Sequence, residues 1–275
     1  MVALSAAPST RARTLLPPAA VLAAVLGAWE LGLGWAEVPG YVLPRPTAIA
    51  VKLWQEVEPL AGAVGTTLGE AVLGYVIGNL LGFGLAVVFF YFRTLDRVAM
   101  LPIVASNSVP AVAFAPVIIL WFGVGMTSKV VLVAYITCFI CLQNQLQGFR
   151  QCDPQAVNVL RSFGASEWRI FRTLRLPASL PYLFTALRMG SIRSVIIAIV
   201  AEMLGAYAGV GWVIFETTAS MDFLRLWAAV IAASASGVAF FVLVSTVERR
   251  VLWWHASIGA TGRAGRRRGR GNDDV

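Results

Sequence analysis

The side chains on which most enzymes rely are scarce in this sequence. His255 is the only histidine, which excludes both a paired-histidine metal motif and a Ser-His-Asp triad. Glu202, Asn107 and the serines offer no matched nucleophile and base. No Gly-x-x-x-x-Gly-Lys-Ser/Thr loop is present, so if the protein consumes ATP, another chain must hydrolyse it. We therefore expect no catalytic site, no metal site and no cofactor in this chain, and an intramembrane enzyme is disfavoured.

One polar triplet lies inside an otherwise apolar part of the chain. Ser106, Asn107 and Ser108 come about ten residues after Arg97, which at about 1.5 Å per residue puts them near the bilayer middle. Pro110 follows, and a proline there frees backbone groups beside the triplet. Two interpretations stay open, a lining of a solute pathway and simple hydrogen bonding between helices.

Glu202 is the clearest ionisable residue within an apolar run. A carboxylate at membrane depth usually faces a cavity or a partner side chain. Gating or lining of a pathway is one interpretation, and a paired group that packs helices together is the other. Arg193 lies on the same run, but nine positions along one helix is too far for direct contact.

The elements that must position these groups follow from composition. Of 275 residues, 58% are hydrophobic and 13% charged, and mean hydropathy is +0.76, whereas soluble domains are about a quarter charged. We predict an all-α membrane protein with six transmembrane helices of roughly 20 residues each. The expected spans are Leu15–Leu33, Leu68–Phe92, Val98–Phe122, Val130–Phe149, Pro181–Gly205 and Leu226–Val247.

Small residues recur within the second expected span. Gly74, Gly78 and Gly82 are spaced by four residues and so share one helix face. Such a stripe lets two backbones approach closely. We interpret it as a packing surface.

Basic residues set the expected orientation, because Lys and Arg stay on the cytoplasmic side. One side holds the clusters 11–13, 93–97, 150–175 and 249–270. The other holds only Arg45, Lys52, Lys129 and Arg225. We expect both termini in the cytoplasm and the protein in the cell membrane. The basic tail, 251–275, is expected to lie near anionic lipid headgroups and not on nucleic acid.

The loop between the fourth and fifth spans is basic and amphipathic, and it favours two short helices on the cytoplasmic side. Pro154 suits the start of the first helix and Gly164 its end. Ser166 can cap the second helix, and Leu176-Pro177 is expected to stop it. A helix held between two spans can transmit a push from a soluble partner. An interfacial helix that only anchors the loop is the alternative.

The run from Asn158 to Trp168, followed by Leu176-Pro177, resembles the coupling loop of ATP-binding-cassette importer permeases. In that family a Glu-Ala-Ala-x-x-x-Gly-Ala motif precedes a Leu-Pro. Other stretches are similar to the sulfonate, taurine and nitrate branch of the family: Val109-Pro110, Ala113, Pro116, Leu120-Trp121-Phe122-Gly123-Val124-Gly125, Asn144, Gly148, Ala186-Leu187-Arg188, Ala201-Glu202-Met203 and Gly209-Val210-Gly211-Trp212. Asn158 stands where the family has its glutamate, and it can still cap or hydrogen-bond.

The resemblance implies a type I importer permease fold and a transport subunit without an ATPase site of its own. Two ATPase subunits would bind ATP and Mg, and a second permease copy and an extracytoplasmic substrate-binding protein would complete the assembly. The implied ATPase-coupling residues are Asn158, Arg161, Ser162, Gly164, Ala165, Ser166 and Glu167. The implied translocation-pathway residues are Ser106, Asn107, Ser108, Pro110, Glu202 and Met203.

The chain then divides into a cytoplasmic tail (1–14), a first helix with an extracytoplasmic loop (15–65), a core permease domain (66–250) and a basic tail (251–275). The branch implies a small organic or inorganic anion as cargo, such as a sulfonate, taurine or nitrate. Related permeases carry thiamine-precursor, riboflavin-like or other heterocyclic substrates, which is the alternative. A secondary transporter is the second alternative, although no inverted repeat is visible.

Overall fold

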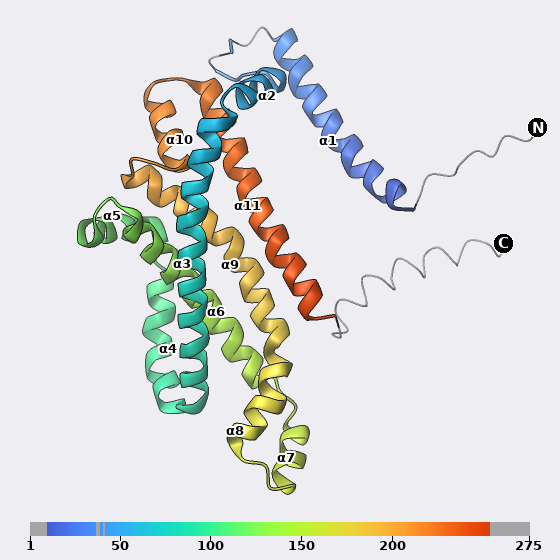
Figure 1. Ribbon diagram of the computed structural model, residues 1–275, viewed down its shortest axis with the longest axis vertical. Coiled ribbons are helices and arrows are strands. Elements are labelled where there is room, and N and C mark those ends of the chain that lie inside the picture. The colour runs from blue at the N-terminus through green and yellow to red at the C-terminus, as the bar shows by residue number, and fades with distance from the viewer. Residues whose placement is uncertain (1–9, 37–38, 41, 254–275) are drawn as a thin grey trace, which may run out of the picture.

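A computed structural model gives the fold of residues 10–36, 39–40 and 42–253 (Figure 1). Within these residues every regular element is a helix, as predicted. The side chains of residues 10–16, 18–19, 106–107 and 111 lie outside this description. So do His255 and the basic tail.

The helices follow one another with short connections. In chain order they are α1 (Thr10–Trp35), α2 (Pro46–Gln55), α3 (Val57–Tyr91), α4 (Arg93–Asn107), α5 (Ala111–Phe122), α6 (Met126–Arg150), α7 (Pro154–Ser162), α8 (Glu167–Ile170), a π-helical segment (Phe171–Arg175), α9 (Leu176–Gly205), α10 (Val210–Ala219) and α11 (Phe223–Val251).

Four helices among the described residues are long and apolar enough to cross a membrane. They are α3, α6, α11 and the continuous helix Glu167–Gly205. Ala20–Trp35 and Val112–Phe122 are apolar but shorter. The multi-pass architecture is therefore confirmed, while helix length supports four of the six expected spans.

The expected third span, Val98–Phe122, is wrong as a continuous helix. The chain leaves the helical conformation after Asn107 and starts α5 at Ala111. Pro110 has an extended backbone, with φ −55° and ψ 130°, and a proline also pushes the residue before it out of the helical region. Pro110 thus separates this segment into α4 and α5, whereas Pro116 is accommodated within α5.

α3 and α6 pack with their backbones in close contact, and the glycine stripe of α3 makes this possible. A Cβ atom at Gly74 would lie 2.6 Å from Val133 Cβ, and Cβ atoms at Gly78 and Gly82 would lie closer still to backbone carbonyls of α6. The predicted packing role is confirmed. Gly148 allows the same close approach between α6 and α9, since a Cβ atom at Gly148 would lie 2.8 Å from Tyr182 Cβ.

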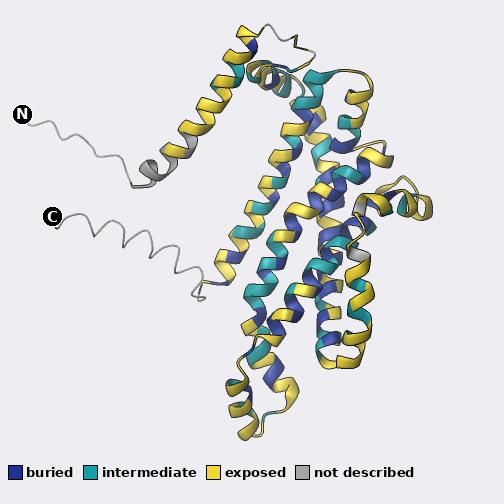
Figure 2. Ribbon diagram, turned by 180° about the vertical axis from the view of Figure 1, so that it is seen from behind, coloured by how far each residue is buried: buried dark blue, intermediate teal, exposed yellow. Residues whose placement is uncertain are grey.

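Buried residues gather where the helices meet, and exposed residues run along the outer faces (Figure 2). Leu80, Leu81 and Leu243 are examples of large apolar side chains that stay exposed. An apolar outer surface, with polar side chains such as Thr67, Gln145 and Glu202 kept in the interior, suits a chain surrounded by lipid. At the end near α7 and α8, Phe89, Phe149 and Phe171 form a separate aromatic core.

α1 slants away from the bundle and joins it at one end only (Figure 1). There Trp29 packs edge-on against Trp227, with ring centroids 5.5 Å apart, and the Thr47 hydroxyl donates to Glu30 at 2.8 Å. Nearby, Glu56 pairs with Lys52 at 2.8 Å and with Arg225 at 2.7 Å. Burial opposes ionisation of Glu56, but the hydrogen bonds from Lys52 and Arg225 prevail and lower its pKa.

Replacement of Gly78 by leucine is expected to destabilise the bundle, because the new side chain would collide with the α6 backbone. Overpacking of this kind costs about 1–3 kcal/mol. Gly84→Leu is the matched control, since a Cβ at Gly84 on the same helix meets nothing within 4 Å. The melting temperature of the purified protein in detergent should fall for Gly78→Leu alone. Equal melting temperatures for the two variants would contradict this account of the α3–α6 contact.

Candidate functional site

The loop between α6 and α9 has the two helices that the sequence predicts, each with its expected start. Asp153 caps α7 by accepting from the Gln155 N–H at 2.9 Å, and Pro154 occupies the first turn. Gly164 ends α7 with φ +74°, a conformation that glycine adopts without strain. Ser166 then caps α8 by accepting from the Arg169 N–H at 3.3 Å.

A small apolar core holds the loop together. Cys152, Val157 and Ile170 are buried in it, with Leu160, Ala165 and Leu174 packed around them. The Ala165 N–H also donates to the Leu160 carbonyl at 3.0 Å, which closes the turn between the two helices. The loop is therefore a compact unit and not an extended tether.

The predicted coupling residues lie together on the exposed tip of this unit. Ala165 is half-buried, and the other six are exposed: Asn158, Arg161, Ser162, Gly164, Ser166 and Glu167. Arg161 pairs with Glu167 at 2.7 Å, but both are more than half exposed, and such pairs contribute little. Two aromatic side chains that the sequence reasoning did not single out share the tip: Phe163 is 83% exposed and Trp168 is 63% exposed.

The predicted helix stop at Leu176-Pro177 is wrong, because the chain stays helical from Glu167 to Gly205. Pro177 lacks a backbone N–H, and the π-helical segment before it adapts the hydrogen bonding. The Leu176 N–H donates to the Phe171 carbonyl, five residues back. α8 and α9 therefore form one continuous rod.

Arg175 fixes the base of this rod to the rest of the bundle. Its guanidinium lies 4.8 Å from the centre of the Phe90 ring, and it donates to the Phe149 carbonyl at 3.3 Å. Arg150 and Asp96 form a further ion pair that joins α6 to α4. Arg175 thus ties the base of the rod to α3 and α6.

At the opposite end of the bundle, Glu202 lies in a polar cluster with 0% of its surface exposed. Its carboxylate accepts from the Thr67 hydroxyl at 2.7 Å and from the Gly211 N–H at 2.7 Å. Thr67 in turn accepts from the Val210 N–H at 2.9 Å. Glu202 thus joins α3, α9 and the start of α10, and in this conformation it does not face an open pathway.

Lys129 is buried as well, with 1% exposure, although the sequence reasoning placed it in an outer loop. It lies in the first turn of α6 and donates to the Gly125 and Gly205 carbonyls at 3.1 and 2.5 Å. It also interacts electrostatically with Glu70 and Glu202. The signal available in the sequence was its position: a lysine directly followed by a long apolar run.

Two glycines shape the segment that receives the Glu202 carboxylate. Gly209 has φ +96°, and a Cβ there would overlap the carboxylate. A Cβ at Gly211 would lie 2.7 Å from Glu202 Cβ and closer to the Ile199 carbonyl. Only glycine fits at either position, so the Gly-Val-Gly sequence is required by the cluster.

The remaining predicted pathway residues are placed elsewhere. Ser108 and Pro110 lie exposed in the break between α4 and α5, and Ser108 donates to the Val104 carbonyl of its own helix at 3.1 Å. Met203 is 37% exposed beside the buried Glu202. The side chains of Ser106 and Asn107 lie outside the described residues.

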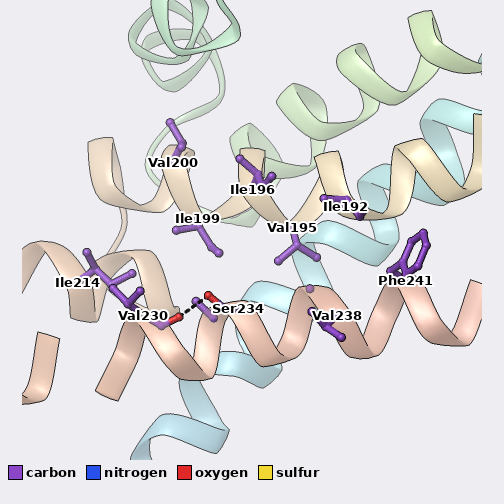
Figure 3. A pocket seen from close by; sticks show the side chains of 12 residues that line it. Ile192, Val195, Ile196, Ile199, Val200, Ile214, Val230, Ser234, Val238 and Phe241 are labelled. Atoms are coloured by element: carbon purple, nitrogen blue, oxygen red, sulfur yellow. Dashed lines mark hydrogen bonds between the residues drawn. The ribbon is translucent and has the colours of Figure 1, made fainter. Parts of the chain in front are cut away.

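A hollow of about 450 Å³ lies between α9 and α11 (Figure 3). Its walls are apolar, with Val195, Ile199 and Phe241 among them. Ser234 is the one polar side chain in its lining, and it donates to the Val230 carbonyl of its own helix at 2.8 Å. This hollow has no group with which to hold a small anion.

The chain matches a known protein family and shares its fold with a solved structure. A family model described as binding-protein-dependent transport system inner membrane component matches residues 61–253. The crystal structure of an amino acid ABC transporter with histidines shares the fold, with a TM-score of 0.59 and 19% identity over 73% of this chain and 97% of that one.

Three curated relatives extend over most of the chain. The riboflavin transport system permease protein RibX of Chloroflexus aurantiacus is 29% identical over 83% of this chain and 86% of its own. The formylaminopyrimidine transport permease protein ThiX of Halalkalibacterium halodurans is 28% identical over 89% and 98%. The putative aliphatic sulfonates transport permease protein SsuC of Bacillus subtilis is 26% identical over 88% and 87%.

Gly209→Ala is expected to destabilise the polar cluster for two reasons. A backbone with φ 96° and ψ 167° costs a non-glycine residue about 1–3 kcal/mol, and the methyl group would collide with Glu202. Gly65→Ala, where a Cβ meets nothing within 4 Å, is the control. Thermal unfolding in detergent should show a lower melting temperature for Gly209→Ala only. A Gly209→Ala protein as stable as Gly65→Ala would refute the tight fit described here.

Proposed function

The chain belongs to the family of binding-protein-dependent transport system inner membrane components, and from this premise we propose that it is the transmembrane permease subunit of an ATP-driven importer. Its relatives are permease subunits of ABC transporters and not enzymes. In the proposed assembly, two ATPase subunits bind ATP and Mg, and an extracytoplasmic binding protein delivers the solute.

The observation that carries the proposal is the compact loop at residues 154–177. Its exposed tip presents Phe163 and Trp168 to the surrounding solution, and exposed aromatic residues are typical of protein contact sites. Behind the tip, α8 continues into α9 without a break. A partner seated on this tip would therefore push directly on a membrane helix.

The charge distribution supports the proposed orientation. Five arginines lie in or beside this loop: Arg150, Arg161, Arg169, Arg172 and Arg175. Basic residues are retained on the cytoplasmic side of a membrane. In our proposal the loop and both termini are cytoplasmic. The loop then lies where an ATPase would meet it, and closure of the ATPase dimer would move α9 relative to α3 and α6.

A second copy of the chain completes the proposed pathway. α3, α6 and α9 pack together through Gly74, Gly82 and Gly148, so their shared interior leaves little room for a solute. Alternating access in transporters commonly works by rocking of bundles against each other. We place the pathway between two copies, with the segment Ser106–Pro110 and the region of Glu202 and Met203 facing it in one state of the cycle.

The proposed cargo is a small organic or inorganic anion, such as a sulfonate, taurine or nitrate. Support comes from the relative named for aliphatic sulfonates and from the motifs shared with that branch. Relatives named for riboflavin and formylaminopyrimidine transport are 29% and 28% identical, against 26% for the sulfonate relative, so a heterocyclic solute is the second candidate. A secondary transporter is disfavoured, since the family model describes binding-protein-dependent systems.

Uptake into proteoliposomes that contain the chain, its ATPase and its binding protein distinguishes the two cargo classes. We expect ATP-dependent accumulation of radiolabelled taurine or an alkanesulfonate, with riboflavin and formylaminopyrimidine unable to compete. Competition by either heterocycle, with no uptake of the anions, would favour the second candidate.

Phe163→Asp is expected to weaken the contact with the ATPase, because it places a charge in an apolar contact. The amount of ATPase that copurifies with the permease should fall by about tenfold or more, which corresponds to about 1.4 kcal/mol. Phe92→Asp is the control, since Phe92 is also exposed but lies at the end of α3 and outside the loop. An unchanged ATPase ratio for Phe163→Asp would argue against docking at this tip.

A further inference from the structure

Glu70 lies one helical turn after Thr67 on α3, and its side chain faces the same polar cluster. It is 5% exposed, and its carboxyl lies within hydrogen-bonding reach of the Glu202 carboxyl. Within the described part of the chain, its Oε2 atom has no hydrogen-bond partner. The two carboxyl groups thus meet in the interior, more than 130 positions apart in sequence.

Two carboxyl groups can hydrogen-bond each other only if one of them holds a proton, because ionised carboxylates only accept. Glu202 is the group whose oxygens are occupied as acceptors. Its Oε1 accepts from the Thr67 hydroxyl at 2.7 Å, and its Oε2 accepts from the Gly211 N–H at 2.7 Å. Glu70 has no such donors around it, so Glu70 is the partner that carries the proton.

The net charge of the cluster also indicates one bound proton. Among the described residues, the ionisable groups of the cluster are Glu70 from α3, Lys129 from α6 and Glu202 from α9; α10 contributes backbone N–H groups. Uncompensated buried charge is costly. One protonated carboxyl, one carboxylate and one ammonium leave the cluster neutral.

We propose that Glu70 and Glu202 form a buried proton-binding site, in which Glu70 holds a proton and donates it in a hydrogen bond to the Glu202 carboxylate opposite Lys129. The bound proton lets Glu202 keep its bonds to Thr67 and Gly211 and so fastens the start of α10 to α3 and α9. Loss of the proton would place two like charges side by side and loosen this attachment. The ligand of the site is a proton.

Infrared spectroscopy tests the proposal, because a protonated carboxylic acid has a carbonyl stretch that a carboxylate lacks. The purified full-length protein in lipid nanodiscs at pH 7 should have such a band, and the band should shift in D₂O. Glu70→Gln should remove it. Glu58→Gln is the control, since Glu58 is exposed on the same helix and should leave the band unchanged.

Glu202→Gln separates a shared proton from a carboxyl that is neutral merely because it is buried. Without the Glu202 charge, Glu70 faces Lys129 alone and should ionise, so this variant should also lose the band. No carboxylic acid band in the wild-type protein at pH 7 would overturn the proposal. So would a band that survives in Glu70→Gln, or one that persists unchanged in Glu202→Gln.

Discussion

Close backbone contact between α3 and α6 is the constraint on which the rest of the structure depends. Helices in a bilayer gain little by burying apolar surface against each other, because lipid tails are just as apolar, so association depends on van der Waals packing and hydrogen bonds. Gly74, Gly78 and Gly82 supply that packing, and the Gln145 amide adds a bond to Ser179 at 2.8 Å between α6 and α9. These contacts hold α3, α6 and α9 together. All three helices therefore contribute to the base of the loop and to the polar cluster around Glu202.

The two ends differ in their physical character. The loop between α6 and α9 is held by a small apolar core and presents aromatic residues outward. The cluster at the opposite end is held by buried polar groups around Glu202, whose arrangement depends on Lys129 and on glycines at 209 and 211. α9 connects these ends as one rod from Glu167 to Gly205. One helix therefore carries both the second half of the loop and Glu202.

Local signals in the sequence predicted local structure well. Pro154, Gly164 and Ser166 each have a conformational preference that fixes a helix end, and a glycine every fourth residue marks a packing face. Such local signals do not predict contacts between residues that lie far apart in the sequence. Nothing near Thr67 or Glu70 in sequence reveals that α3 faces Glu202, and charge counting alone assigned Lys129 to a loop. The π-helical segment also escaped prediction, because it is a response to Pro177 that depends on how the rod packs against Phe149 and Phe90.

Photo-crosslinking at position 163 tests the central claim, that the loop tip is where the ATPase acts. A photoreactive phenylalanine analogue at Phe163 in the membrane-embedded complex should give an adduct with the ATPase subunit, with a yield that changes when ATP is added. The same analogue at Leu80, which is exposed on α3 and lies outside the loop, should give no adduct with the ATPase. Adducts from position 163 to lipid alone, in a complex that still hydrolyses ATP, would contradict the account.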